Sequence, residues 1–103
     1  MIFVVASIEV KDGQRDAFVK HFKELVPDVK AEDGCIDYGP TVDVEGTGID
    51  RQVPVRGNVV TVVEKWESLE HLKAHLVAPH MGVFREKVKD LVVGAKLQVL
   101  QPA

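Results

Sequence analysis

The sequence predicts an α+β domain of the ferredoxin-like type, with the order β-α-β-β-α-β and an antiparallel sheet. Two observations predict it: four segments alternate or run apolar in the manner of strands, and the segments between them repeat their apolar residues at helical spacing. The chain has 103 residues, which is too few for a second hydrophobic core. We therefore expect a single domain spanning residues 1–103.

The first expected strand covers residues 2–10, which are β-branched and apolar on both faces at the start. A helix is expected after Asp12, a candidate N-cap, and before Gly34, a candidate stop. Pro27 lies inside this helix and is expected to kink or split it. The buried stripe of the helix should contain Phe18, Phe22, Leu25, Val26 and Val29.

Residues 35–44 alternate well enough to form a strand, but Gly39 and Pro40 favour an edge position or a bulge. Residues 45–57 are rich in glycine and proline and predict a long connection. Residues 58–66 are the clearest strand, and their valines make both faces apolar at its centre. This strand is expected to be central in the sheet.

Ser68 is expected to cap a short helix, and Pro79 to begin another that ends at Gly94. The buried residues of these helices should be Leu72, Leu76, Met81, Phe84, Val88 and Leu91. Residues 95–100 supply the last strand and complete the ferredoxin-like order.

Helices can cover only one face of such a sheet, yet two of its strands are apolar on both faces. A contiguous apolar face is a liability in a monomer. We therefore expect a homodimer in which Phe3, Val5, Val59 and Val63 lie against the second copy, closing the two sheets into a barrel-like assembly.

The composition excludes several partners. The formal net charge of −3 gives no electrostatic reason to expect nucleic acid, and no apolar run is long enough to cross a membrane. The first residues lack the basic start and the cleavage site of a signal peptide. Cys35 is the only cysteine, which fits a reducing compartment, so a cytoplasmic protein is expected.

Two histidines and two residues of the 58–66 strand are candidates for chemistry. Trp66 and Glu64 share a face of that strand, and a buried Glu64 either reaches solvent at the sheet edge or meets a partner in a cavity. His75 and His80 can point between helix and sheet, whereas His71 is expected in water. No metal site is expected, because no further ligands stand at a recognisable spacing. The glycines at 46, 48 and 57 precede a strand and not a helix, so flavin and nucleotide binding have no support.

The run Glu64-Lys65-Trp66-Glu67-Ser68, followed by Leu72, His75, Pro79-His80 and Phe84, resembles the antibiotic biosynthesis monooxygenase family, including its quinol-monooxygenase-like members. The resemblance implies a dimeric α/β barrel and a monooxygenase that needs no cofactor and oxidises a small aromatic or quinol-type substrate with molecular oxygen. It implies that Trp66 lines the pocket and that His75 or His80 accepts the phenolic proton. Substrate contacts are then expected from Glu64, Tyr38, Met81, Phe84 and Asn58.

The family also contains sugar-phosphate isomerases and members without known activity, so two alternatives stay open: a small-molecule isomerase, or a non-catalytic dimer that binds a small molecule. A basic pocket would favour the isomerase, with Lys73, Arg85 and Lys87 as candidates. An absent cavity would favour the binding dimer. The resemblance disfavours haem degradation. The haem-degrading members of the family use an asparagine in the first strand, a tryptophan in the helix after the third strand and a histidine in the last helix. This chain has no asparagine in its first strand and has His75 and Arg85 at the other two places.

Overall fold

The computed structural model describes all 103 residues. The elements follow the order β1 (Ile2–Val10), α1 (Arg15–Lys30), β2 (Cys35–Thr41), β3 (Val59–Trp66), α2 (Leu69–Leu76), α3 (Pro79–Val88) and β4 (Val92–Leu100). The four strands form one antiparallel sheet in the order β2-β3-β1-β4. This confirms the ferredoxin-like prediction, with β3 and β1 at the centre. Within one chain the sheet is open, and β2 and β4 are its edges.

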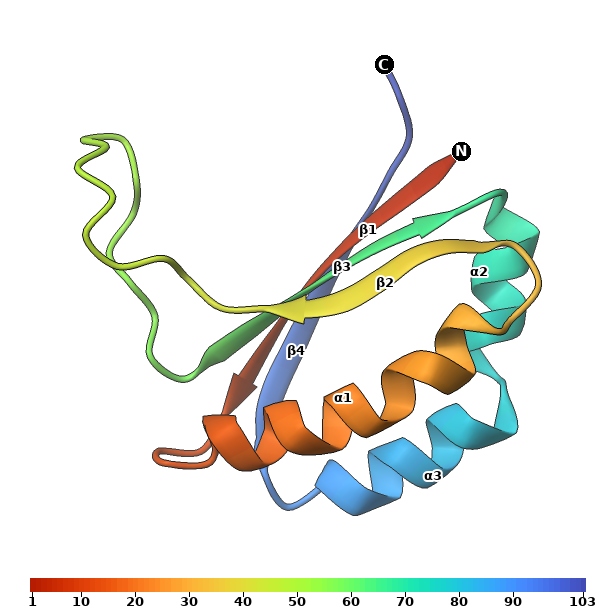
Figure 1. Cartoon of the computed structure of the whole chain (residues 1–103), viewed down its shortest axis with the longest axis horizontal. Helices are drawn as coiled ribbons and strands as arrows, with labels where there is room; N and C mark the ends of the chain where they lie inside the picture. The colour runs from red at the N-terminus through yellow and green to blue at the C-terminus, as the bar shows by residue number, and fades with distance from the viewer.

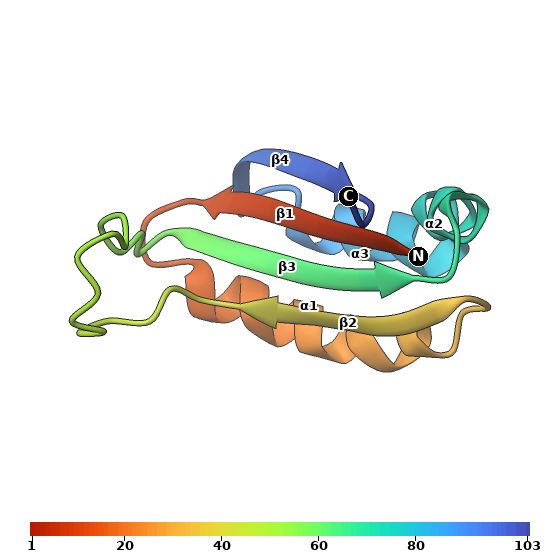
Figure 2. The ribbon, with the colours of Figure 1, turned by 90° about the horizontal axis from the view of Figure 1, so that it is seen from above.

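The helices lie on one side of the sheet. Figures 1 and 2 show α1 and α3 side by side beneath the strands, with α2 beyond the end of β3. The core between the layers is aromatic: the Phe18 ring lies 5.8 Å from that of Phe84, and the Phe22 ring stacks on Tyr38 at 5.3 Å. No helix is long and apolar enough to cross a bilayer.

The helix α1 differs from its prediction in two respects: the residue that precedes it and the effect of Pro27. It begins at Arg15 after Gln14, and no side chain caps it. Asp12 instead accepts a hydrogen bond from the side chain of Asn58. Pro27 does not split the helix, which runs on to Lys30. The missing N–H of Pro27 costs only the one helical bond to the Lys23 carbonyl, and the helix ends three residues later at Lys30.

The chain from α3 to β4 also differs from its prediction. The helix ends at Val88, because Leu91 turns back to donate to the Val88 carbonyl. β4 then begins at Val92 and contains Gly94, which therefore does not end the helix. β2 is shorter than expected and ends at Thr41, after which the connection over residues 42–57 extends away from the body of the molecule (Figure 1).

The face of the sheet opposite the helices is bare. Val5 and Val63 lie across from each other on it, with 37% and 47% of their surface exposed. Phe3 and Val59 share this face by register. On the helix side, Leu97 of β4 is 56% exposed, because the helices do not reach that edge. The exposed apolar surface is thus larger than the sequence predicts.

Candidate active site

A cavity of about 320 Å³ lies between the helices and the sheet. This volume lies at the lower end of the range of roughly 300–1,000 Å³ that is usual for small-molecule pockets. Twelve of its 15 lining residues are hydrophobic, and the others are Glu64, His75 and Arg85. Leu76, Arg85 and Ala95 are exposed members of the lining, so they mark the mouth.

β3 supplies a buried carboxyl group to the cavity. Its period of two turns Glu64 and Trp66 toward the helices, with 7% and 0% of their surface exposed. The Trp66 Nε1 donates to Glu64 Oε1 over 2.9 Å. Burial raises the pKa of Glu64, while this hydrogen bond and the neighbouring His75 act in the opposite direction. Glu64 therefore lies inside the cavity with Trp66 as its hydrogen-bond partner, and does not reach solvent at the sheet edge.

His75 is the buried imidazole of the site. It lies in α2 with 2% of its surface exposed, and its ring centre is 4.7 Å from that of Trp66 and 5.3 Å from that of Tyr38. Its Nδ1 lies 2.9 Å from Oε2 of Glu32. A carboxylate only accepts, so Nδ1 carries the proton in this contact. The Nε2 atom makes no hydrogen bond to the protein and is left as an acceptor.

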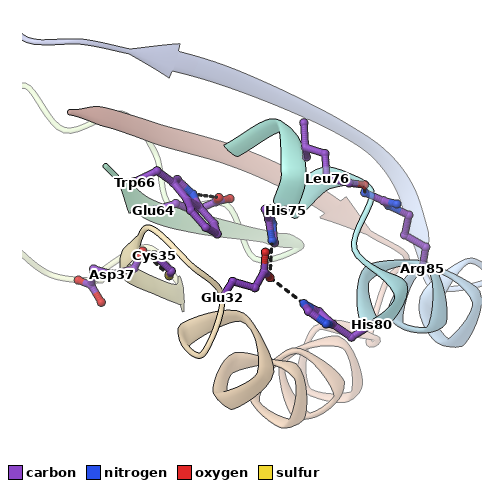
Figure 3. A network of polar contacts seen from close by, with 9 residues as sticks. All are labelled: Glu32, Cys35, Asp37, Glu64, Trp66, His75, Leu76, His80 and Arg85. Atoms are coloured by element: carbon purple, nitrogen blue, oxygen red, sulfur yellow. Dashed lines mark hydrogen bonds and ion pairs between the residues drawn. The ribbon is translucent and has the colours of Figure 1, made fainter. Parts of the chain in front are cut away.

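Glu32 joins the two predicted histidines. It lies in the turn between α1 and β2, and the same Oε2 atom is 2.7 Å from Nε2 of His80, at the start of α3 (Figure 3). His80 does not line the cavity; it belongs to a smaller hollow of about 150 Å³ between α1 and α3. Sequence reasoning missed Glu32, which is 43 residues from His75 and 48 from His80.

The other predicted site residues divide into two groups. Tyr38, Met81 and Phe84 line the cavity, and burial, followed by the charge of Glu64, raises the pKa of Tyr38. Asn58 does not join them, because it precedes β3 at the end opposite Trp66.

Two further residues correct the sequence reasoning. His71 is not in open water: its Nδ1 lies 2.6 Å from the Ser68 hydroxyl, and its Nε2 lies 3.4 Å from the carboxylate of Asp33. Among the candidate cations, only Arg85 reaches the cavity, where its Nη2 donates to the Leu76 carbonyl over 2.9 Å.

Fold and site together define a ferredoxin-like α+β protein with an apolar chamber that contains one imidazole, one buried carboxyl group and one guanidinium. Residues 1–87 match the profile of the family described as antibiotic biosynthesis monooxygenase. The chain is also 39% identical, over 99% of its length and 98% of the relative's, to the Escherichia coli (strain K12) protein named "Probable quinol monooxygenase YgiN". The protein belongs to the antibiotic biosynthesis monooxygenase family.

Solved structures agree on the fold. A conserved protein from Methanosarcina mazei Go1 superposes with a TM-score of 0.82 at 22% identity, covering 99% of this chain and 92% of that one. A protein from Shewanella oneidensis superposes with a TM-score of 0.76 at 27% identity, covering 96% of this chain and 87% of that one. The resemblance stated from the sequence is therefore confirmed.

Proposed function

We propose that the protein is a monooxygenase that oxidises a small aromatic or quinol-type substrate with molecular oxygen and without a cofactor. One observation carries the proposal: the mostly apolar, aromatic chamber is lined by His75, whose Nε2 makes no hydrogen bond to the protein. Family membership supports it, as does the name of the Escherichia coli relative. Residues 1–103 would act as one domain.

His75 is the base in this proposal. Glu32 accepts a hydrogen bond from the Nδ1–H of His75, which keeps the proton on Nδ1 and leaves Nε2 free to remove a phenolic proton from the substrate. The resulting anion is electron-rich and gives its electrons to oxygen, forming a carbon-bound peroxide. Return of the proton from His75 lets the O–O bond break. The carbon that carries the peroxide loses its hydrogen as a proton while the O–O bond breaks, so one oxygen atom stays on the product as a carbonyl and the other leaves as water. The substrate supplies all four electrons that this reduction of oxygen needs.

The remaining residues act around this base. Arg85 at the mouth is placed to attract the anionic form of the substrate. Trp66 holds the His75 ring from one side, while Glu64 engages the indole nitrogen. Tyr38, Met81 and Phe84 shape the apolar walls. His80 has the supporting role of sharing Glu32, since it does not line the chamber.

The proposal includes a homodimer. Val5 and Val63 form the centre of the bare apolar face, which a second copy would cover with the same residues. The isomerase alternative is less well supported, because a phosphate group would meet only one cation, Arg85, in a chamber that also contains Glu64.

Oxygen uptake tests the reaction. With 1,4-naphthoquinol or anthrone, the wild type should consume oxygen well above the enzyme-free rate, and His75→Ala should lose roughly a hundredfold to ten-thousandfold of that rate. His71→Ala removes a histidine outside the chamber and is the matched control. No turnover of any quinol or anthrone, or full activity in a folded His75→Ala protein, would refute the proposal.

A further inference from the structure

The cluster of Glu32, His75 and His80 has the composition of a metal site. The three residues come from the α1–β2 turn, α2 and α3, and their ligand atoms all lie within 4.8 Å of one another. Two imidazole nitrogens and one carboxylate oxygen form a donor set that suits zinc and neighbouring divalent transition metals, with a coordination position left for water.

We propose that Glu32, His75 and His80 bind a divalent transition-metal cation of the zinc and cobalt class, and that the bound cation switches off the base. The second half rests on the proposed function, whereas the binding site does not. Neither histidine alone would make such a site. Glu32 completes the site, because one of its carboxylate oxygens contacts both imidazole rings (Figure 3).

A bound cation requires the three ligand atoms, which lie within 4.8 Å of one another, to rearrange. The Glu32 oxygen lies 2.9 Å from His75 Nδ1 and 2.7 Å from His80 Nε2. Bonds of about 2.0–2.1 Å in a tetrahedral site place ligand atoms roughly 3.3 Å apart, so the contacts must open by about half an ångström. His75 is held between Trp66 and Tyr38. The side chains of Glu32 and His80 are 15% and 28% exposed, so they can move and leave a path from solvent.

The charge of the cluster also favours a cation. Glu32 pairs with no lysine or arginine, and its only ion-pair partners are the two histidines. A divalent cation would compensate this half-buried carboxylate directly.

Cation binding and base function exclude each other. A metal ion on Nδ1 takes the position of its proton, and neutral His75 then carries its proton on Nε2. That nitrogen becomes a donor and cannot accept a phenolic proton. The metal-free protein is therefore the active form, and the cation is a reversible inhibitor.

Calorimetric titration with zinc chloride tests the binding site on protein stripped with a chelator. The wild type should bind one cation per chain in the micromolar range, and cobalt chloride should give the visible absorption of a low-symmetry site. Glu32→Gln and His80→Gln should each weaken binding at least about tenfold. His71→Gln is the matched control, because it disrupts a histidine–carboxylate pair outside the cluster and should bind as the wild type does. Circular dichroism verifies that each variant is folded.

No binding of zinc or cobalt at millimolar concentration, or equal binding in Glu32→Gln, His80→Gln and the wild type, overturns the site. Oxygen uptake tests inhibition: zinc should suppress the wild-type rate with the midpoint found by calorimetry, and a chelator should restore it. In His80→Gln, the midpoint should move to higher zinc relative to its own uninhibited rate. Binding without inhibition overturns the switch. Absence of turnover without zinc would refute the proposed function alone, since calorimetry still decides the site.

Discussion

The two faces of the sheet differ sharply in what covers them. On the helix side, Val60, Val62, Glu64 and Trp66 of β3 are between 0% and 7% exposed. One residue along the strand, Val63 faces the other way and is 47% exposed. The same strand therefore places adjacent side chains in environments of very different polarity. Only the covered face can hold a carboxyl group and an imidazole away from water, and only the bare face needs a partner.

The largest effect should come from emptying the covered face. Trp66→Ala removes a fully buried indole, the donor to Glu64 and the ring against His75. We expect it to lower the free energy of unfolding by about 3–5 kcal/mol, measured by urea denaturation. Trp66→Phe keeps most of the volume but leaves Glu64 without its donor, and should cost about 1–3 kcal/mol. A loss below about 1 kcal/mol in Trp66→Ala would show that the covered face is not the stabilising one.

The second effect concerns the bare face. Val63→Asp places a charge on the bare face, where a second copy would bury it without a partner of opposite charge. We expect the dissociation constant of the dimer to rise more than about a hundredfold, since burying an unpaired charge costs at least roughly 3 kcal/mol.

Sedimentation velocity at micromolar concentration measures this change. Val77→Asp is the matched control, because Val77 is 81% exposed beyond the end of α2 and should not alter association. A wild type that is monomeric at this concentration would remove the argument from the bare face.

The sequence predicted this two-faced strand because a period of two is a local property. It placed Trp66 and Glu64 together and Val63 opposite them, and helical spacing placed His75 on the flank of α2. It could not show where along β3 the cavity ends. Asn58 shares the face of Trp66 by counting, yet it lies at the end of β3 where it meets Asp12 rather than the cavity.

Sequence reasoning missed the carboxylate of Glu32 for a different reason. Nothing in the residues around Glu32 indicates a partner, because the histidines that it contacts lie 43 and 48 residues further along the chain. Only the packing of the α1–β2 turn against α2 and α3 brings them together. The expectation of no metal site depended on spacing along the chain, and for that reason did not include a cluster that forms only in space.

The smallest effect should come from the residue next to Val63 on the covered side. Burial raises the pKa of Glu64 above its ordinary value of 4.5, so the folded protein holds this proton more tightly than the unfolded chain. Stability contributed by this group must then fall as the pH rises through the interval above 4.5, up to the folded pKa.

Glu64→Gln keeps an oxygen for the Trp66 Nε1 and removes the ionisation. The variant should therefore lose less stability than the wild type when urea denaturation is compared across pH 4.5 to 7.5. His75 and Glu32 also face this region, so His75→Gln and Glu32→Gln backgrounds separate their titrations from that of Glu64. If the free energy of unfolding varies with pH in the same way for Glu64→Gln and the wild type, burial on the covered face does not raise the pKa of Glu64, and this contrast with the bare face is lost.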